Sequence, residues 1–352
     1  MQTTSDLIRE HKWKIIFTLI IGGFIIFAIS IAVGLQDILN VLKRSDPEII
    51  IVALLLEIII IGMWTKRWSL ILDVIDKSPG FSTLFVMMFT SLFGNNLTPG
   101  AAGGEPMRAY LLSKFEGISF DLAFVSASAD RVFEFFPFVL VSGFAVYMIS
   151  TWHLPFLETL LISLLIIIIM GFFGILIYVG VKRDIAERLL LSLAKSLLPI
   201  FVRITKKEIT LHYVTEQISF YVGRFSTGFA TVLQDKQMFT LGLSISFMMW
   251  GTDMLRMYLC FVAVGSFPPL VPMIIIYTIG ILITILPTIP GALGLREATM
   301  VGLFLVVGVP ADIVLAASLI DRLISYLMPT IVGAITTVYY GKLLNKMDAN
   351  SS

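Results

Sequence analysis

Long apolar runs dominate the chain and are separated by short polar segments. Six of the runs are long enough to cross a hydrocarbon core, which takes about 20 apolar residues in a helix; they cover 13–33, 48–65, 121–149, 156–181, 239–264 and 312–340. The first run follows basic residues, as in a signal peptide, but no small-residue cleavage site follows it, so we predict a span. The pattern predicts an all-α polytopic membrane protein.

Two further apolar segments are interrupted in the middle by proline and glycine. One joins 81–97 to 104–115, and the other joins 272–286 to 295–307. Each piece is short for a crossing of about 20 residues. We therefore predict about six full spans plus two re-entrant Pro-Gly hairpins, each of which enters and leaves the membrane on one side.

The two halves of the sequence share a register. An odd number of predicted crossings separates the hairpins, so the repeats are inverted, as in transporters whose substrate site lies at the midplane. We expect a single integral membrane domain over 1–352, with repeat 1 at about 13–150, repeat 2 at about 156–340 and an insertion at about 182–238. A shift of 191 residues pairs, without a gap, Pro99-Gly100-Ala101 with Pro290-Gly291-Ala292, Gly103 with Gly294, Gly117 with Gly308, and Asp130-Arg131 with Asp321-Arg322.

The basic residues predict the orientation. With the N-terminus inside, most of the 25 lysines and arginines fall in cytoplasmic segments, among them Lys66, Arg67 and Lys77. Only Lys43 and Arg44 lie outside, which satisfies the positive-inside rule. We expect a multi-pass protein of the cell membrane with both termini in the cytoplasm.

Polar residues at the two breaks and in the neighbouring spans are the candidate substrate-binding residues. Small residues let the backbone approach a ligand, and a helix starting near Glu105 would point free N–H groups into the break, which favours an anion. Arg108, one turn further, adds a charge-assisted phosphate contact. Charges within membrane spans are costly and usually face the bundle interior. The full set is Asn96, Thr98, Gly100, Gly104, Glu105, Arg108, Asp130, Arg131, Glu134, Pro290, Gly291, Gly294, Arg296, Glu297, Asp321 and Arg322.

A structural interpretation stays open beside the binding one. Glu105 and Arg108 are three residues apart and can pair with each other to fix the first hairpin. The Asp-Arg dipeptides at 130–131 and 321–322 can brace one repeat against the other. Asp253 and Arg256, also three residues apart, form a further candidate pair.

The insertion is too polar to cross the membrane. Between 182 and 236, leucines and isoleucines recur at helical spacing with lysines and arginines between them. That pattern is typical of an interfacial helix on an anionic leaflet. A helical hairpin that packs on the bundle from the cytoplasm fits equally well.

Composition narrows the chemistry. The chain is 57% hydrophobic and 14% charged, against roughly 25% charged in soluble domains, and its net charge of +1 argues against nucleic-acid binding. His11, His153 and His212 are far apart in sequence and outside the predicted core, so they indicate no triad or metal cluster, and no P-loop is present. We expect no cofactor, no bound metal and no enzymatic activity.

Three motifs at the two breaks are similar to those of a known family. They are Asn96-Leu97-Thr98-Pro99-Gly100, Gly104-Glu105-Pro106 with Arg108, and Pro290-Gly291 with Gly294 and Arg296-Glu297. The chain resembles, over nearly its whole length, the flippase-like membrane domain family that includes the membrane region of lysylphosphatidylglycerol synthases. The resemblance implies movement of lipids with charged or glycosylated head groups between leaflets. We expect no aminoacyl-transferase domain after the last span, so lipid aminoacylation is not carried over.

Three functions stay in competition. The leading hypothesis is a lipid translocator whose substrate, an anionic phospholipid or a polyprenyl-phosphate-linked lipid, passes its head group through a polar cavity between the hairpins. A secondary transporter of a small anion would use the same broken helices. An integral membrane transferase acting on lipid-linked substrates, with Glu105 or Glu297 as base, is the third. A homo-oligomer and a separate lipid-modifying enzyme stay open as partners.

Overall fold

The fold is helical throughout the part of the chain that the structure describes. This computed structural model describes residues 31, 34–149, 156–205, 211–285 and 292–351. The first predicted span, 13–33, therefore lies almost wholly outside the described residues. The α-helices are α2 (Leu35–Lys43), α3 (Pro47–Ile75), α4 (Phe81–Leu97), α5 (Gly104–Phe115), α6 (Phe120–Ile149), α7 (Phe156–Val181), α8 (Arg183–Thr205), α9 (Leu211–Gln234), α10 (Lys236–Ala263), α11 (Leu270–Ile285), α12 (Leu295–Val306), α13 (Ala311–Arg322) and α14 (Met328–Ser351).

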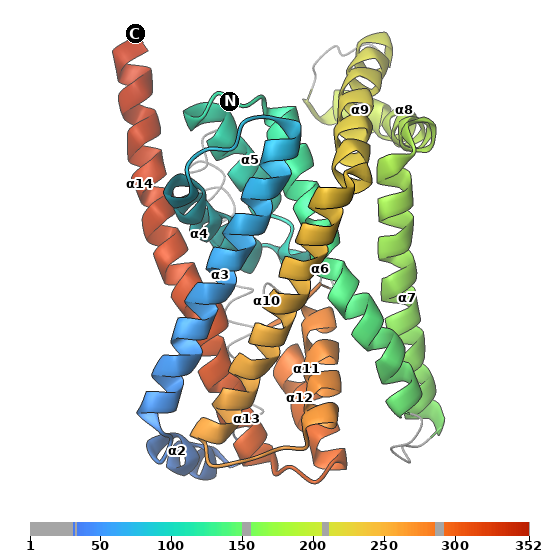
Figure 1. The fold of residues 1–352 in the computed structure, drawn as a ribbon. Helices are drawn as coiled ribbons and strands as arrows, with labels where there is room; N and C mark the ends of the chain where they lie inside the picture. Colours follow the sequence, from blue (N-terminus) through green and yellow to red (C-terminus); the bar gives the residue numbers. More distant parts are fainter. Residues whose placement is uncertain (1–30, 32–33, 150–155, 206–210, 286–291, 352) are drawn as a thin grey trace.

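Two long helices, α3 and α10, cross side by side through the centre of the bundle in opposite directions (Figure 1). Their ends are fixed by caps: Asp46 accepts the backbone N–H groups of Glu48 and Ile49, and Asp235 accepts that of Met238. Such caps satisfy donors that the first helical turn leaves open. The Asp46 backbone N–H also donates to the carbonyl of Ala263, 2.8 Å away, which ties the start of α3 to the end of α10.

Large apolar side chains cover much of the outer surface. On α3, for example, Ile51, Leu55, Ile58 and Ile59 are all more than 40% exposed. Water-soluble monomers rarely expose apolar surface on this scale. By length and composition alone, one helix of the described residues, Pro47–Ile75, is apolar enough to cross a membrane. The similarly long α6 and α10 carry several ionisable residues near their middles, whereas the apolar part of α3 contains Glu57 as its single charge.

The first Pro/Gly-interrupted segment forms a helical hairpin, α4 and α5. A short 3₁₀ turn, Pro99–Ala101, separates the two helices, and Gly100 and Ala101 both have positive φ angles, 67° and 51°. The helices approach closely because Gly104 has no side chain: a Cβ there would lie 2.5 Å from the Ser91 carbonyl oxygen. The bounds of both helices are those predicted from the sequence.

The second interrupted segment forms α11 and α12, which pack against each other at the opposite end of the bundle from α4 and α5 (Figure 1). Residues 286–291 between them, including Pro290 and Gly291, lie outside the described residues. Two backbone features recur at the 191-residue shift. Ala101 and Ala292 both have positive φ, as do Gly117 and Gly308, the glycines that end α5 and α12. The shared register thus extends to backbone conformation at these two pairs, whereas the matched Gly103 and Gly294 differ, with φ angles of -86° and 83°.

The insertion folds into two helices, α8 and α9. They pack against each other, and α9 also lies along α6 and α3. In Figure 1, α8 lies at the upper end of α7, beside α9. The insertion is therefore a helical hairpin docked on the bundle.

The last predicted span, 312–340, is not a single regular helix. Helix α13 ends at Arg322, a π-helical turn follows over Leu323–Leu327, and α14 then continues to Ser351. Single π turns inside helices are frequent at functional sites because they redirect side chains. Here the turn carries Tyr326, whose hydroxyl donates to the Asn96 carbonyl at 2.9 Å.

Candidate functional site

Asp130 on α6 is the centre of the first buried charge cluster. The Asp130 cluster consists of Asp130, Arg67, Arg108 and Trp64. One carboxylate oxygen of Asp130 accepts from Arg67 Nε at 2.6 Å, and the other accepts from Arg108 Nη1 at 2.9 Å and Trp64 Nε1 at 2.6 Å. Arg108 also lies over the ring of Trp68, 4.8 Å from its centroid. Asp130 and Arg67 are fully buried, so the cluster encloses one net positive charge.

Asp321 on α13 takes the corresponding place in the second half. The Asp321 cluster consists of Asp321, Arg256, Arg296, Glu57, Asp253 and Tyr277. Arg296 donates to one oxygen of Asp321 at 2.8 Å, and Arg256 donates to the other at 2.9 Å. Arg296 lies 4.9 Å from the ring centroid of Tyr277, much as Arg108 lies over Trp68. In both halves, therefore, an aspartate joins the helix after the break to one of the two central helices.

The two clusters differ in their charge. Arg256 pairs with Asp253 at 2.7 Å and also with Glu57, in addition to Asp321. Three carboxylates thus surround Arg256, whereas Asp130 is the carboxylate shared by Arg67 and Arg108. The pairing of Asp253 with Arg256 is the one that their spacing indicates.

The arginine that follows each aspartate holds the start of the helix after the break. Arg131 pairs with Glu105 at 3.2 Å and donates to the carbonyl of Ala101, the residue with the positive φ. In the second half, Arg322 pairs with Glu297 at 2.5 Å. The other oxygen of Glu297 accepts the N–H of Gly294 at 2.7 Å and caps α12. Glu105 therefore pairs with Arg131 and not with Arg108, because Arg108 is turned toward Asp130.

Among the described residues, two buried polar contacts join α3 to α10 across the halves. Arg67 on α3 donates to the hydroxyl of Ser246 on α10 at 2.8 Å, and Arg256 on α10 pairs with Glu57 on α3. At the charge clusters, α3 and α10 therefore supply the bracing between repeats, and α4 adds a further link through Asn96, which bonds Tyr326 and Thr330. The Asp-Arg dipeptides hold the hairpins to this central pair.

A polar cavity of about 240 Å³ lies between the two clusters. Its wall includes four arginines and three carboxylates, contributed by α3, α6, α10, α12 and α13. Among the described residues, four N–H groups of wall residues are buried and have no hydrogen-bond partner. They are Arg67 Nη2, Trp250 Nε1, Arg296 Nε and Arg322 Nη2. A volume of this size holds about eight waters at ~30 Å³ each or a small polar group.

The predicted binding residues fall into two sets. Of those that the structure describes, Asn96, Glu134, Arg296 and Arg322 line the cavity. The others hold the framework behind its wall. They are Thr98, Gly100, Gly104, Glu105, Arg108, Asp130, Arg131, Gly294, Glu297 and Asp321, while Pro290 and Gly291 lie outside the described residues.

The start of α5 differs from the expectation of free backbone N–H groups. The Gly103 N–H donates to the hydroxyl of Thr98 at 2.8 Å, and the Gly104 N–H donates to the side-chain oxygen of Asn95 at 2.7 Å. The hairpin therefore caps its own second helix. The donors that face the cavity come from side chains instead.

Several residues of the site were not predicted. The sequence places Arg67 in a polar segment after the second span, whereas α3 continues to Ile75 and buries this side chain completely. The apolar run Leu70–Leu72 after Arg67 was the available signal. Glu57 is the single charge within an apolar run, and this pattern could have identified it as a candidate site residue. Nothing in the local sequence distinguished Trp250 or Tyr277.

Comparisons with known proteins agree with this architecture. The family model of the lysylphosphatidylglycerol synthase TM region matches residues 15–333. Two UPF0104 membrane proteins of Methanothermobacter thermautotrophicus are 46% identical over 337 residues, covering 96% of both chains, and 31% identical over 350 residues, covering 96% of this chain and 100% of the relative. A UPF0104 membrane protein of Pyrococcus horikoshii is 27% identical and covers 93% of this chain and 97% of its own. The chain is therefore a helical membrane protein that belongs to the lysylphosphatidylglycerol synthase transmembrane-region family.

Proposed function

We propose that this protein moves a lipid with an anionic or glycosylated head group between the two leaflets of the cell membrane. The head group passes through the central cavity while the acyl or prenyl tails remain in the bilayer. In this proposal α4–α5 and α11–α12 are re-entrant hairpins that reach the cavity from opposite sides. The chain is a translocator without chemistry of its own, and a separate enzyme makes or uses the lipid.

The observation that carries the proposal is the set of four unpartnered N–H groups at the cavity. Each buried donor left without an acceptor costs about 1–3 kcal/mol. A phosphate group offers several strong acceptor oxygens and forms charge-assisted bonds to arginine. Each of the four arginines of the wall already pairs with a carboxylate in or behind it, so the proposal rests on the unpartnered donors and not on a net charge. The acceptor oxygens of an anionic head group would satisfy these donors.

The test removes one of these N–H donors and changes the shape of its side chain as little as possible. Trp250→Phe removes the unpartnered indole N–H and keeps an aromatic ring in the wall. A hydrogen bond to a charged group contributes about 1.5–3 kcal/mol, so translocation of an acyl-labelled phosphatidylglycerol in liposomes should fall about tenfold or more. Stability should stay unchanged or rise slightly, because a buried unmet donor is removed.

The matched control lies two positions before Trp250 on α10 and faces outward. Met248 is 62% exposed, and Met248→Leu should leave translocation unchanged. Labelled polyprenyl phosphate and phosphatidylcholine are run in parallel to separate head-group classes. Equal rates for Trp250→Phe and wild type would contradict the cavity as the route.

A further arm separates the competing transport function. Uptake of inorganic phosphate or sulfate into the same liposomes, without movement of any labelled lipid, would assign the cavity to a small soluble anion. Movement of lipid that Trp250→Phe slows would support the translocator. Release of a chemically altered lipid by the purified protein would instead indicate a transferase.

A further inference from the structure

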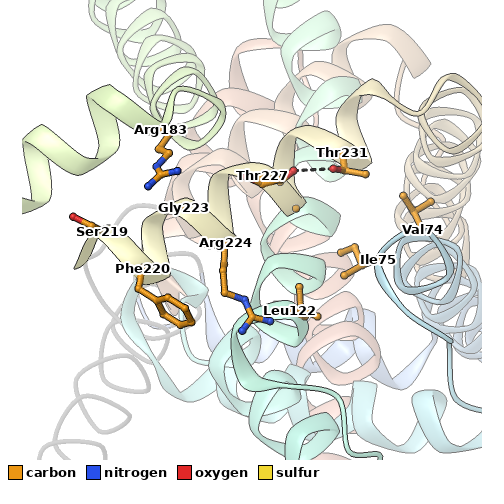
Figure 2. A pocket seen from close by; sticks show the side chains of 11 residues that line it. Val74, Ile75, Leu122, Arg183, Ser219, Phe220, Gly223, Arg224, Thr227 and Thr231 are labelled. Carbon is orange, nitrogen blue, oxygen red and sulfur yellow. Dashed lines mark hydrogen bonds between the residues drawn. The ribbon is translucent and has the colours of Figure 1, made fainter. Parts of the chain in front are cut away.

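A second cavity lies at the surface, between the α8–α9 hairpin and the helices α3 and α6. Its volume is about 520 Å³, larger than that of the central cavity. Figure 2 shows that Val74 and Ile75 of α3 and Leu122 of α6 contribute apolar side chains, while Arg183 and Arg224 contribute guanidinium groups. The groove thus has an apolar floor and two cationic side chains.

The position of the Arg183 guanidinium depends on a glycine. A Cβ on Gly223 of α9 would lie 3.1 Å from the central guanidinium carbon of Arg183. In Figure 2 the side chain of Arg183 lies over α9 at this glycine, while Arg224 extends from α9 toward Leu122. The absence of a side chain at 223 therefore lets a charge from α8 reach the groove.

Both arginines retain hydrogen-bonding capacity. Among the described residues, Arg183 pairs through Nε with Glu187 at 3.7 Å, and its side chain is 56% exposed. Arg224 pairs through Nε with Asp121 at 2.5 Å and donates through Nη2 to Ser119 at 3.4 Å, with its side chain 41% exposed. A guanidinium group has five N–H donors. Two outward-facing donor sets thus border the apolar floor.

The surroundings of the groove match a lipid surface. Residues 182–236 contain nine lysines and arginines against five aspartates and glutamates. On α8, Leu189, Leu190 and Leu193 are each more than 40% exposed, and on α9 Phe220 and Tyr221 are more than 50% exposed. Basic residues beside exposed apolar and aromatic side chains are typical of elements that lie in an anionic membrane interface.

We propose that this groove binds an anionic phospholipid of the leaflet at the α8–α9 end of the bundle, with its phosphate between Arg183 and Arg224 and an acyl chain on the apolar floor. The site is separate from the central cavity. Its floor residue Leu122 lies eight positions before Asp130 on α6, so a bound lipid would contact the helix that carries the Asp130 cluster.

The experiment uses the full-length protein in phosphatidylcholine nanodiscs. They contain a few per cent of phosphatidylglycerol with a photoactivatable diazirine on its acyl chain, and adducts are located by peptide mass spectrometry. Adducts are expected within 70–76, 119–125 and 219–231. Each basic residue near an anionic lipid contributes about a fivefold factor in binding. The double variant Arg183→Gln/Arg224→Gln should therefore lose roughly 25-fold of this labelling.

Three variants keep the test independent of folding. Arg183→Gln alone removes an exposed charge that has one long ion pair. Gly223→Val leaves Arg183 in the protein but pushes its guanidinium group away from the groove. Each variant should lose about fivefold of the groove labelling. Arg188→Gln on the same helix is the control, because Arg188 does not line the groove. Central-cavity variants such as Trp250→Phe should leave groove adducts unchanged, so failure of the translocator proposal is distinguishable.

Each outcome decides the proposal. Loss in the groove variants with full labelling in Arg188→Gln supports it. Equal labelling in all variants overturns it, as does equal labelling by a phosphatidylcholine probe, which would mean that the head group is not selected. Displacement by millimolar inorganic phosphate also overturns it, because the site would then bind free anions.

Discussion

Replacing Asp130 with asparagine should be among the most destabilising substitutions in the protein. Its two carboxylate oxygens accept from Arg67, Arg108 and Trp64 at 2.6–2.9 Å. Asparagine has nearly the same shape but one acceptor oxygen and no charge. Its NH₂ group would face one set of these donors, and both guanidinium groups would lose their shared carboxylate.

The expected loss follows from the burial of the pair. Removing one partner of a buried ion pair costs about 3–5 kcal/mol, because the remaining charge is left uncompensated. Total stabilities are typically about 5–15 kcal/mol, so Asp130→Asn should remove roughly a fifth or more of the total. Reversible unfolding in mixed micelles with increasing SDS, followed by circular dichroism, measures the change in the free energy of unfolding. Asp37→Asn on the exposed face of α2 is the control and should change it by less than about 0.5 kcal/mol.

Two comparisons make this reasoning refutable. Adding Arg108→Gln to Asp130→Asn removes one of the two uncompensated charges, so the double variant should be more stable than the sum of the single losses by about 1.5 kcal/mol or more. Asp321→Asn should cost less than Asp130→Asn, because Arg256 keeps Glu57 and Asp253. A loss below about 1 kcal/mol for Asp130→Asn, or strict additivity with Arg108→Gln, would refute the cluster as a source of stability.

Three further predictions follow from local packing. Gly333→Ala places a methyl 2.3 Å from the Phe89 carbonyl oxygen and should destabilise α14 against α4 by about 1–3 kcal/mol, whereas Gly341→Ala, with open space around it, should be neutral or stabilising in the same unfolding assay. Asp46→Ala removes the cap of α3 and should cost about 1 kcal/mol by that assay. Cys260 is fully buried, so maleimide should label it only after denaturation; rapid labelling of the folded protein would contradict its burial.

Local pattern was sufficient to predict most helices. The two helices of the first hairpin end at the predicted residues because proline and glycine interrupt a helix locally, without any tertiary contact. The bounds 156–181 match α7 for a similar reason, since lysine and arginine follow the apolar run directly. Helix α3 was predicted ten residues too short, because Lys66 and Arg67 interrupt its apolar pattern. Only tertiary contacts compensate the charge of Arg67, and a single sequence does not display them.

The sequence was sufficient to predict which residue types form the candidate site, but not which of these residues pair with each other. The Asp-Arg dipeptides and the charges after each break indicated a buried polar centre, and the structure places them there. The partners could not be predicted, because Arg108 can reach either Glu105 on its own helix or Asp130 on another. The cavity wall also depends on Trp250 and Tyr277, whose neighbours in sequence are ordinary apolar residues.

The antiparallel pair α3 and α10 has a mechanical consequence. Arg67–Ser246 and Arg256–Glu57 join the two helices at separate levels, and the Asp46–Ala263 bond closes one end. Sliding by one helical turn, about 5.4 Å, would break all three contacts at once. We therefore expect α3 and α10 to keep a fixed position relative to each other, as a fixed axle, while the two hairpins move. Spin labels on exposed positions of α3 and α10 should keep one separation with and without lipid; a second separation would show that the axle itself shifts.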